Sequence, residues 1–145
     1  MKSKYQLKLS INEALFNIPK KVRRIDDVAF DGNCYIEKLI INSDIYDSED
    51  PGGSCENMKR LRTVEFKTPQ TYEDGLCFAG CKKLEKVVLA EGTKSIGYMQ
   101  FAGCKNLTTI NFPDSLEMIA GNAFEGCNKL VLPEFEESKI REIKY

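Results

Sequence analysis

The chain has 145 residues, of which 42% are hydrophobic and 30% charged, and its formal net charge is −1. This length fits one domain, no apolar run reaches the roughly 18–20 residues that span a bilayer, and the near-neutral charge argues against a uniformly basic nucleic-acid-binding domain. There is no histidine, the commonest general base and metal ligand near neutral pH, so we expect neither an enzyme nor a metal or cofactor site.

Residues 1–24 are expected to form an N-terminal cap and a partial first repeat. Tyr5, Leu7, Leu9 and Ile11 alternate with polar residues, which is typical of a covering strand. The start lacks the continuous apolar core of a signal peptide. A cytoplasmic location is therefore favoured for the chain as given, and a cell-surface or secreted one if an export signal was removed.

The same region is basic, with Glu13 as its one carboxylate before residue 26. Its cations are Lys2, Lys4, Lys8, Lys20, Lys21, Arg23 and Arg24. An acidic partner or a phosphate could contact them, although a charge run on a solvated edge is the ordinary explanation. No aromatic platform for bases accompanies the cluster, so nucleic acid is disfavoured.

Residues 25–135 repeat with a period of 23. The period is clearest in Phe78, Phe101 and Phe124, and the same step relates Cys81, Cys104 and Cys127, and Leu84, Leu107 and Leu130. More worn copies precede them, giving about six units. A short repeat with fixed apolar positions predicts a solenoid of leucine-rich type, because one unit cannot bury its own apolar face. Alternation in segments such as "LTTINF" predicts one strand per unit, and hence a parallel concave sheet.

The segment opposite each strand, for example "SIGYMQFAGC", is too short for more than a turn or two of helix. We therefore expect short helical or irregular convex turns and a mostly β solenoid of α/β type. Gly80, Gly103 and Gly126 fit the tight turn that leads into each strand.

An acidic loop interrupts the period at residues 43–54, "SDIYDSEDPGGS". Its carboxylates could hold calcium, but they lack the alternating spacing of a known calcium loop. Pro51, Gly52 and Gly53 more simply mark an excursion between two repeats. A contact with a partner remains the other alternative.

The last three copies, "FAGCKKLEKVVL", "FAGCKNLTTINFP" and "FEGCNKLVLP", resemble the BspA-like leucine-rich repeat. The resemblance covers roughly residues 13–143 if the worn copies are included. It implies a modular interaction repeat, often found on surface proteins and sometimes implicated in adhesion, rather than an enzyme.

The six cysteines do not indicate a catalytic or zinc site. Cys81, Cys104 and Cys127 share one repeat position, held by Asn33 and Met58 in earlier copies, so we expect a buried column of small side chains. "CFAGC" has the wrong spacing for a zinc or redox motif. Cys34 and Cys77 lie beside the core positions and are expected to be more exposed, without any feature that would activate them.

The outward residues of the strands form the candidate site. If Val87 and Leu89 point inward, alternation sends their neighbours outward in each unit. The resulting partner-binding set is Lys38, Ile40, Thr63, Glu65, Lys67, Lys86, Val88, Thr109 and Asn111. A varied surface on a regular frame suits protein recognition, although β-branched and threonine residues also simply favour strands.

Residues 136–145 are charged around Ile140 and Ile143, one residue out of register, and are expected to form a C-terminal cap. The sequence thus predicts a single domain over residues 1–145 that binds a protein partner without catalysis, as a monomer or an edge-paired dimer. An adhesin-like domain, a cytoplasmic stoichiometric inhibitor and a structural spacer are the alternatives.

Overall fold

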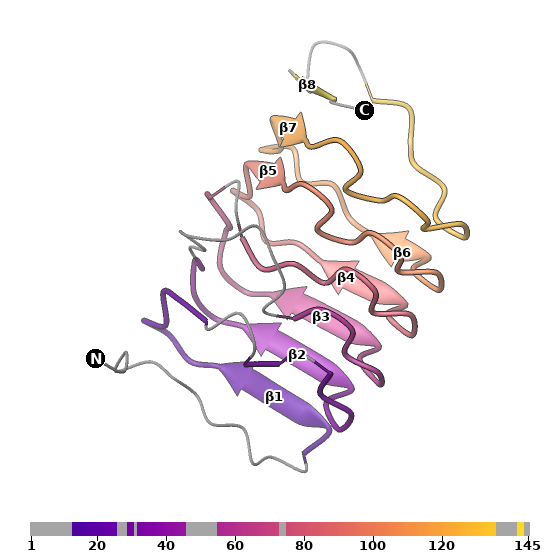
Figure 1. Cartoon of the computed structure of the whole chain (residues 1–145). Helices are drawn as coiled ribbons and strands as arrows, with labels where there is room; N and C mark the ends of the chain where they lie inside the picture. The colour runs from indigo at the N-terminus through magenta and orange to yellow at the C-terminus, as the bar shows by residue number, and fades with distance from the viewer. Residues whose placement is uncertain are drawn as a thin grey trace.

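The chain coils into a solenoid whose turns stack on one another (Figure 1). The computed structural model describes residues 13–25, 29–30, 32–45, 55–72, 75–135 and 142–143. The main sheet is parallel, with five strands in the order β1-β2-β3-β4-β6. Its strands are β1 (Leu15–Ile18), β2 (Lys38–Ile41), β3 (Thr63–Phe66), β4 (Lys86–Val88) and β6 (Thr109–Ile110).

The strand register follows the period of the sequence. Lys38 pairs with Thr63, Thr63 with Lys86, and Lys86 with Thr109. Within each strand of four residues, the second and fourth side chains are buried and the first and third face outward. This alternation confirms the inward and outward positions that the sequence predicts, and it places the apolar columns inside the solenoid.

A second, smaller parallel sheet lies on another wall of the solenoid (Figure 1). It consists of β5 (Ser95–Ile96), β7 (Met118–Ile119) and β8 (Glu142–Ile143). Ile119 pairs with Ile143, so the shift by one residue in the last copy is real. The turns opposite the main sheet are irregular, and the described ranges contain no helix.

The phenylalanine position forms a stacked column in the second half of the solenoid. Phe78 and Phe101 have ring centroids 5.8 Å apart and are nearly parallel, and Phe101 and Phe124 repeat that geometry. Phe30, Phe78 and Phe101 have no exposed surface. Backbone hydrogen bonds also join the irregular turns of neighbouring units. Phe78 N–H donates to Gln100 C=O at 2.7 Å, and Phe101 N–H donates to Ala123 C=O at 2.9 Å.

The glycine position requires the left-handed backbone region. The φ angles of Gly80, Gly103 and Gly126 are 74°, 72° and 75°, and Asn57 occupies the same position with φ of 55°. Residues other than glycine, asparagine and aspartate are strained in this backbone region. The turn before each strand is therefore fixed by one residue per unit, as the sequence predicts.

The cysteine position combines packing with a hydrogen bond. Cys81, Cys104 and Cys127 are buried, and each thiol approaches a carbonyl of the preceding unit. Cys104 Sγ lies 3.3 Å from Phe78 O, and Cys127 Sγ lies 3.0 Å from Phe101 O. Burial raises the pKa of Cys81 to about 12, and the neighbouring Cys127 thiol together with burial raises that of Cys104. Cys81 and Cys104 therefore stay protonated at neutral pH, whereas the hydrogen bond with Cys104 lowers the pKa of Cys127.

The expectation of a strand in the sixth unit is wrong. Residues 131–135 are irregular, and the exposed fractions of Val131 and Leu132 are 87% and 47%. Pro133 occupies the position of Val64, Val87 and Ile110 in the earlier units. A proline lacks the N–H of a ladder donor and restricts the residue before it, so the main sheet ends at β6.

Candidate interaction surfaces

The nine side chains predicted to contact a partner lie together along the outward face of the main sheet. Register places Lys38, Thr63, Lys86 and Thr109 in one row across four strands, and Ile40, Glu65 and Val88 in the next. Lys67 and Asn111 follow the ends of β3 and β6. None of the nine is buried. We call this set the sheet face.

Glu65 is the centre of charge on the sheet face. Lys38 Nζ lies 3.5 Å from Glu65 Oε2, and Lys67 Nζ pairs with the other carboxylate oxygen. The hydrogen bond from Lys67 lowers the pKa of Glu65, and Lys38 adds to the effect. The carboxylate is thus ionised and held in place between two lysines, while Ile40 and Val88 flank it with apolar surface.

Asn111 is already engaged within the protein. Leu89 N–H donates to Asn111 Oδ1 at 2.6 Å, and Asn111 Nδ2 donates to Leu89 C=O at 2.8 Å. In two earlier units, the residue at the repeat position of Pro113 donates its backbone N–H to the preceding unit. Asn42 N–H donates to Ile18 C=O, and Lys67 N–H donates to Ile41 C=O. Pro113 has no N–H to give, so the side-chain amide of Asn111 takes its place.

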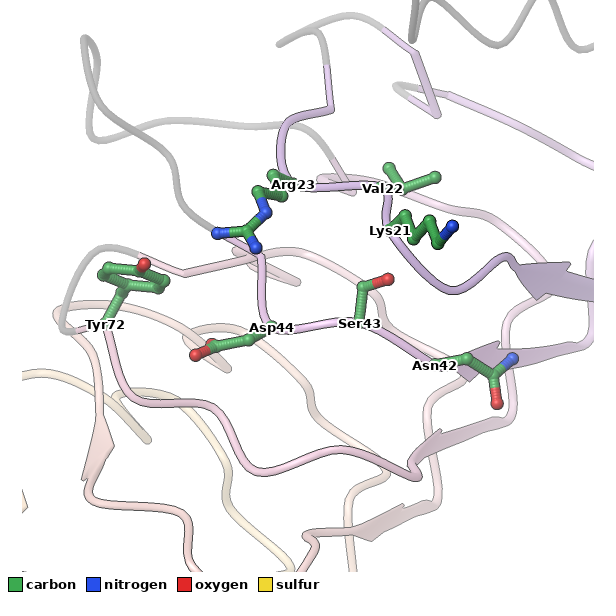
Figure 2. Close-up of a pocket in the computed structure, with 7 residues that line it drawn as sticks. All are labelled: Lys21, Val22, Arg23, Asn42, Ser43, Asp44 and Tyr72. Carbon is green, nitrogen blue, oxygen red and sulfur yellow. The ribbon is translucent and has the colours of Figure 1, made fainter.

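A hollow of about 320 Å³ lies between the turns that follow β1 and β2 (Figure 2). Its lining residues are Lys21, Val22, Arg23, Asn42, Ser43, Asp44 and Tyr72. Ser43 Oγ donates to Pro19 C=O at 2.7 Å, and Asp44 accepts from both the N–H and the hydroxyl of Thr71. Three separate segments build this hollow, and no motif in the sequence signals it.

The acidic loop is only partly within the described residues. Its first two residues, Ser43 and Asp44, line the hollow, and residues 46–54 lie outside the part of the chain that the structure describes. Among the described residues, no group of three or more His, Cys, Asp or Glu side chains could hold a metal ion.

The two cysteines beside the core positions have different surroundings. Cys34 is exposed, whereas Cys77 is half-buried, with its Sγ 3.6 Å from Met99 O. In the described ranges, no helix has the length and apolar character needed to cross a bilayer.

A family model for the BspA type leucine rich repeat region matches residues 4–72 and 74–145 in six copies. No curated protein matches this sequence. A leucine-rich repeat protein from Eubacterium ventriosum ATCC 27560 superposes with a TM-score of 0.70 at 21% identity, over 90% of this chain and 41% of that one. At this identity the likeness concerns the fold alone.

A leucine rich cell surface protein from Faecalibacterium prausnitzii A2-165 is 30% identical, with a TM-score of 0.67, over 82% of this chain and 31% of that one. The present chain therefore spans less than half the length of either of these solved structures. Proteins with this repeat and fold are generally not enzymes, and they commonly act in protein interaction or at the cell surface.

Proposed function

The chain belongs to the BspA-type leucine-rich repeat family, and on that premise we propose that it is a non-enzymatic module that binds a protein partner through the sheet face. The observation that carries the proposal is the chemistry of that face. Cations, a carboxylate, hydroxyls and two aliphatic side chains lie at fixed spacing on hydrogen-bonded strands. Such a surface loses little conformational entropy on binding, because its backbone is already ordered.

The Glu65 cluster supports this proposal. Its two lysines and the flanking Ile40 and Val88 form a charged centre with apolar sides. A few well-packed side chains near the middle of an interface usually account for most of the binding energy. Ile40 and Val88 are the side chains that we expect to act as anchors.

Attachment at the cell surface is a second candidate. It is favoured by the 30% identity to a protein described as a leucine rich cell surface protein. Both candidates use the sheet face, and they differ in where the partner is found. The experiment below also distinguishes a partner-binding module from a structural spacer.

The test compares two double variants that introduce the same charge. Ile40→Arg with Val88→Arg alters the sheet face, whereas Tyr98→Arg with Val131→Arg alters two side chains that are exposed elsewhere. Immobilised wild type captures partners from extracts and from intact cells of the source, and the affinity of the captured protein is measured for each variant.

We expect the sheet-face variant to bind its partner at least about 30-fold more weakly, because two anchors are lost, and the control variant to bind like wild type. A partner whose affinity is the same for both variants would remove the sheet face as the binding site. Absence of any partner would favour a spacer.

A further inference from the structure

The turns that lead into the strands carry a concentration of positive charge. They comprise residues 33–37, 58–62, 81–85, 104–108 and 127–131, and Glu37 and Glu85 are their only carboxylates. Their seven cations are Lys59, Arg60, Arg62, Lys82, Lys83, Lys105 and Lys129. The whole chain has a net charge of −1, so charge is strongly segregated to this edge. We call these turns the basic edge.

The cations of the basic edge form a column along the solenoid. Lys59, Lys82 and Lys105 occupy the same position in successive units, four residues before the paired strand residues Thr63, Lys86 and Thr109. Neighbouring strands are about 4.8 Å apart, so these exposed lysines recur at that interval. In Figure 1 the turns lie one above another at the edge where the arrows of the main sheet begin.

Five of the seven cations have no carboxylate partner among the described residues. Arg60 pairs with Glu37 at 2.9 Å and Arg62 with Glu85 at 3.7 Å, while Lys129 Nζ donates to Asn106 Oδ1 at 2.8 Å. The other four, which are Lys59, Lys82, Lys83 and Lys105, form no ion pair within the part of the chain that the structure describes. Like charges on neighbouring turns repel one another, and a bound polyanion would relieve that repulsion.

We propose that the basic edge binds a linear acidic polysaccharide whose chain runs along the solenoid axis, with a carboxylate or sulfate group on successive sugars. The interval between units is close to the length of one sugar ring, so Lys59, Lys82 and Lys105 can meet anionic groups on successive sugars. An extended acidic peptide has a rise of about 3.3 Å per residue and alternating side chains, which fits this interval poorly.

Single-stranded nucleic acid also fits this surface less well. Its binding usually needs aromatic side chains on which successive bases stack. Tyr35 is the only aromatic residue in these five turns. The basic edge adjoins the sheet face, because its turns end where the strands begin. None of its seven cations belongs to the sheet face, so variants at these cations test the polysaccharide site apart from the protein partner.

The experiment measures binding of purified full-length chain to polygalacturonate and dextran sulfate, with unmodified dextran, oligothymidylate and polyglutamate as competing classes. Isothermal titration is carried out at several NaCl concentrations. Lys82→Gln with Lys105→Gln removes two charges from the basic edge, and Lys20→Gln with Lys21→Gln removes two from the turn after β1. Circular dichroism checks that both variants fold.

We expect one or both acidic polysaccharides to bind more tightly than the other polymers, with an affinity that falls as salt rises. The Lys82/Lys105 variant should bind roughly ten-fold more weakly, as expected for two lost surface ion contacts, and the Lys20/Lys21 variant like wild type. Equal loss in both variants, no binding of either acidic polysaccharide, or a preference for oligothymidylate or polyglutamate would each overturn the proposal.

Discussion

The two halves of the solenoid differ in an unexpected way. The first three units have worn motifs, with Cys55 at the phenylalanine position and Met58 at the cysteine position, yet β1, β2 and β3 each have four residues. The last three units contain the clearest "FAGC" or "FEGC" motifs, but β4 has three residues, β6 has two, and residues 131–135 of the sixth unit add no strand to the main sheet. The best motifs thus accompany the shortest strands.

This difference shows that the motif and the strand are specified by separate positions. The phenylalanine, glycine and cysteine of the motif build the ring column, the left-handed turn and the thiol–carbonyl contacts. The main-sheet strands instead depend on the residues that follow the motif. Pro113 and Pro133 lack the N–H of a ladder donor in the last two units, whereas Asn42 and Lys67 hold the position of Pro113 beside β2 and β3 and donate their N–H groups to Ile18 and Ile41.

The largest expected loss of stability in the second half comes from removing one phenyl ring from the stacked column. Phe101 is fully buried and stacks on Phe78 and Phe124. We expect Phe101→Ala to lower the free energy of unfolding by about 3–5 kcal/mol, because transfer energy is lost and a cavity remains. Urea denaturation followed by circular dichroism measures this change.

Cys55→Ala is the matched variant in the first half, since Cys55 occupies the same position. It removes one sulfur atom from a buried site, and we expect a loss of about 1 kcal/mol, as for a small buried group. Equal losses for the two variants would show that the phenyl ring of Phe101 stabilises the second half no more than the smaller Cys55 stabilises the first.

Glycine substitution sharpens the comparison at the turn. A Cβ on Gly80 would lie 2.2 Å from Asn57 Oδ1, whereas a Cβ on Gly32 would meet nothing within 4 Å, although both residues have positive φ. Backbone strain should cost Gly32→Ala about 1–2 kcal/mol. Crowding should bring the cost of Gly80→Ala to about 2–4 kcal/mol.

The same denaturation series measures both glycine variants. Adding Asn57→Gly to Gly80→Ala removes the crowded side chain. The double variant should therefore regain the stability by which Gly80→Ala falls below Gly32→Ala. If the double variant is no more stable than Gly80→Ala alone, contact with Asn57 is not the cause.

The sequence predicted the apolar columns, the register and the sheet face, because each depends on a side chain that recurs at a fixed interval. It did not predict the second sheet, since two-residue strands such as Ser95–Ile96 leave almost no periodic signal. Nor did it predict the hollow of Figure 2, which joins Lys21, Asp44 and Tyr72 from three units. Asn111 was predicted to face a partner, and its role in the backbone ladder depends on a proline two residues away.

Asn111 offers the finest test of how the second half compensates for its prolines. Its amide supplies both a donor and an acceptor to Leu89, so Asn111→Ala should lower the free energy of unfolding by about 1 kcal/mol. Asn111→Asp keeps the acceptor for Leu89 N–H and loses the donor, and we expect an intermediate value. Amide hydrogen exchange at Leu89 should quicken in Asn111→Ala, because its N–H loses the side-chain acceptor. An unchanged exchange rate would mean that water or a backbone carbonyl replaces the amide. The short strands of the second half would then not need the Asn111 hydrogen bonds to stay paired.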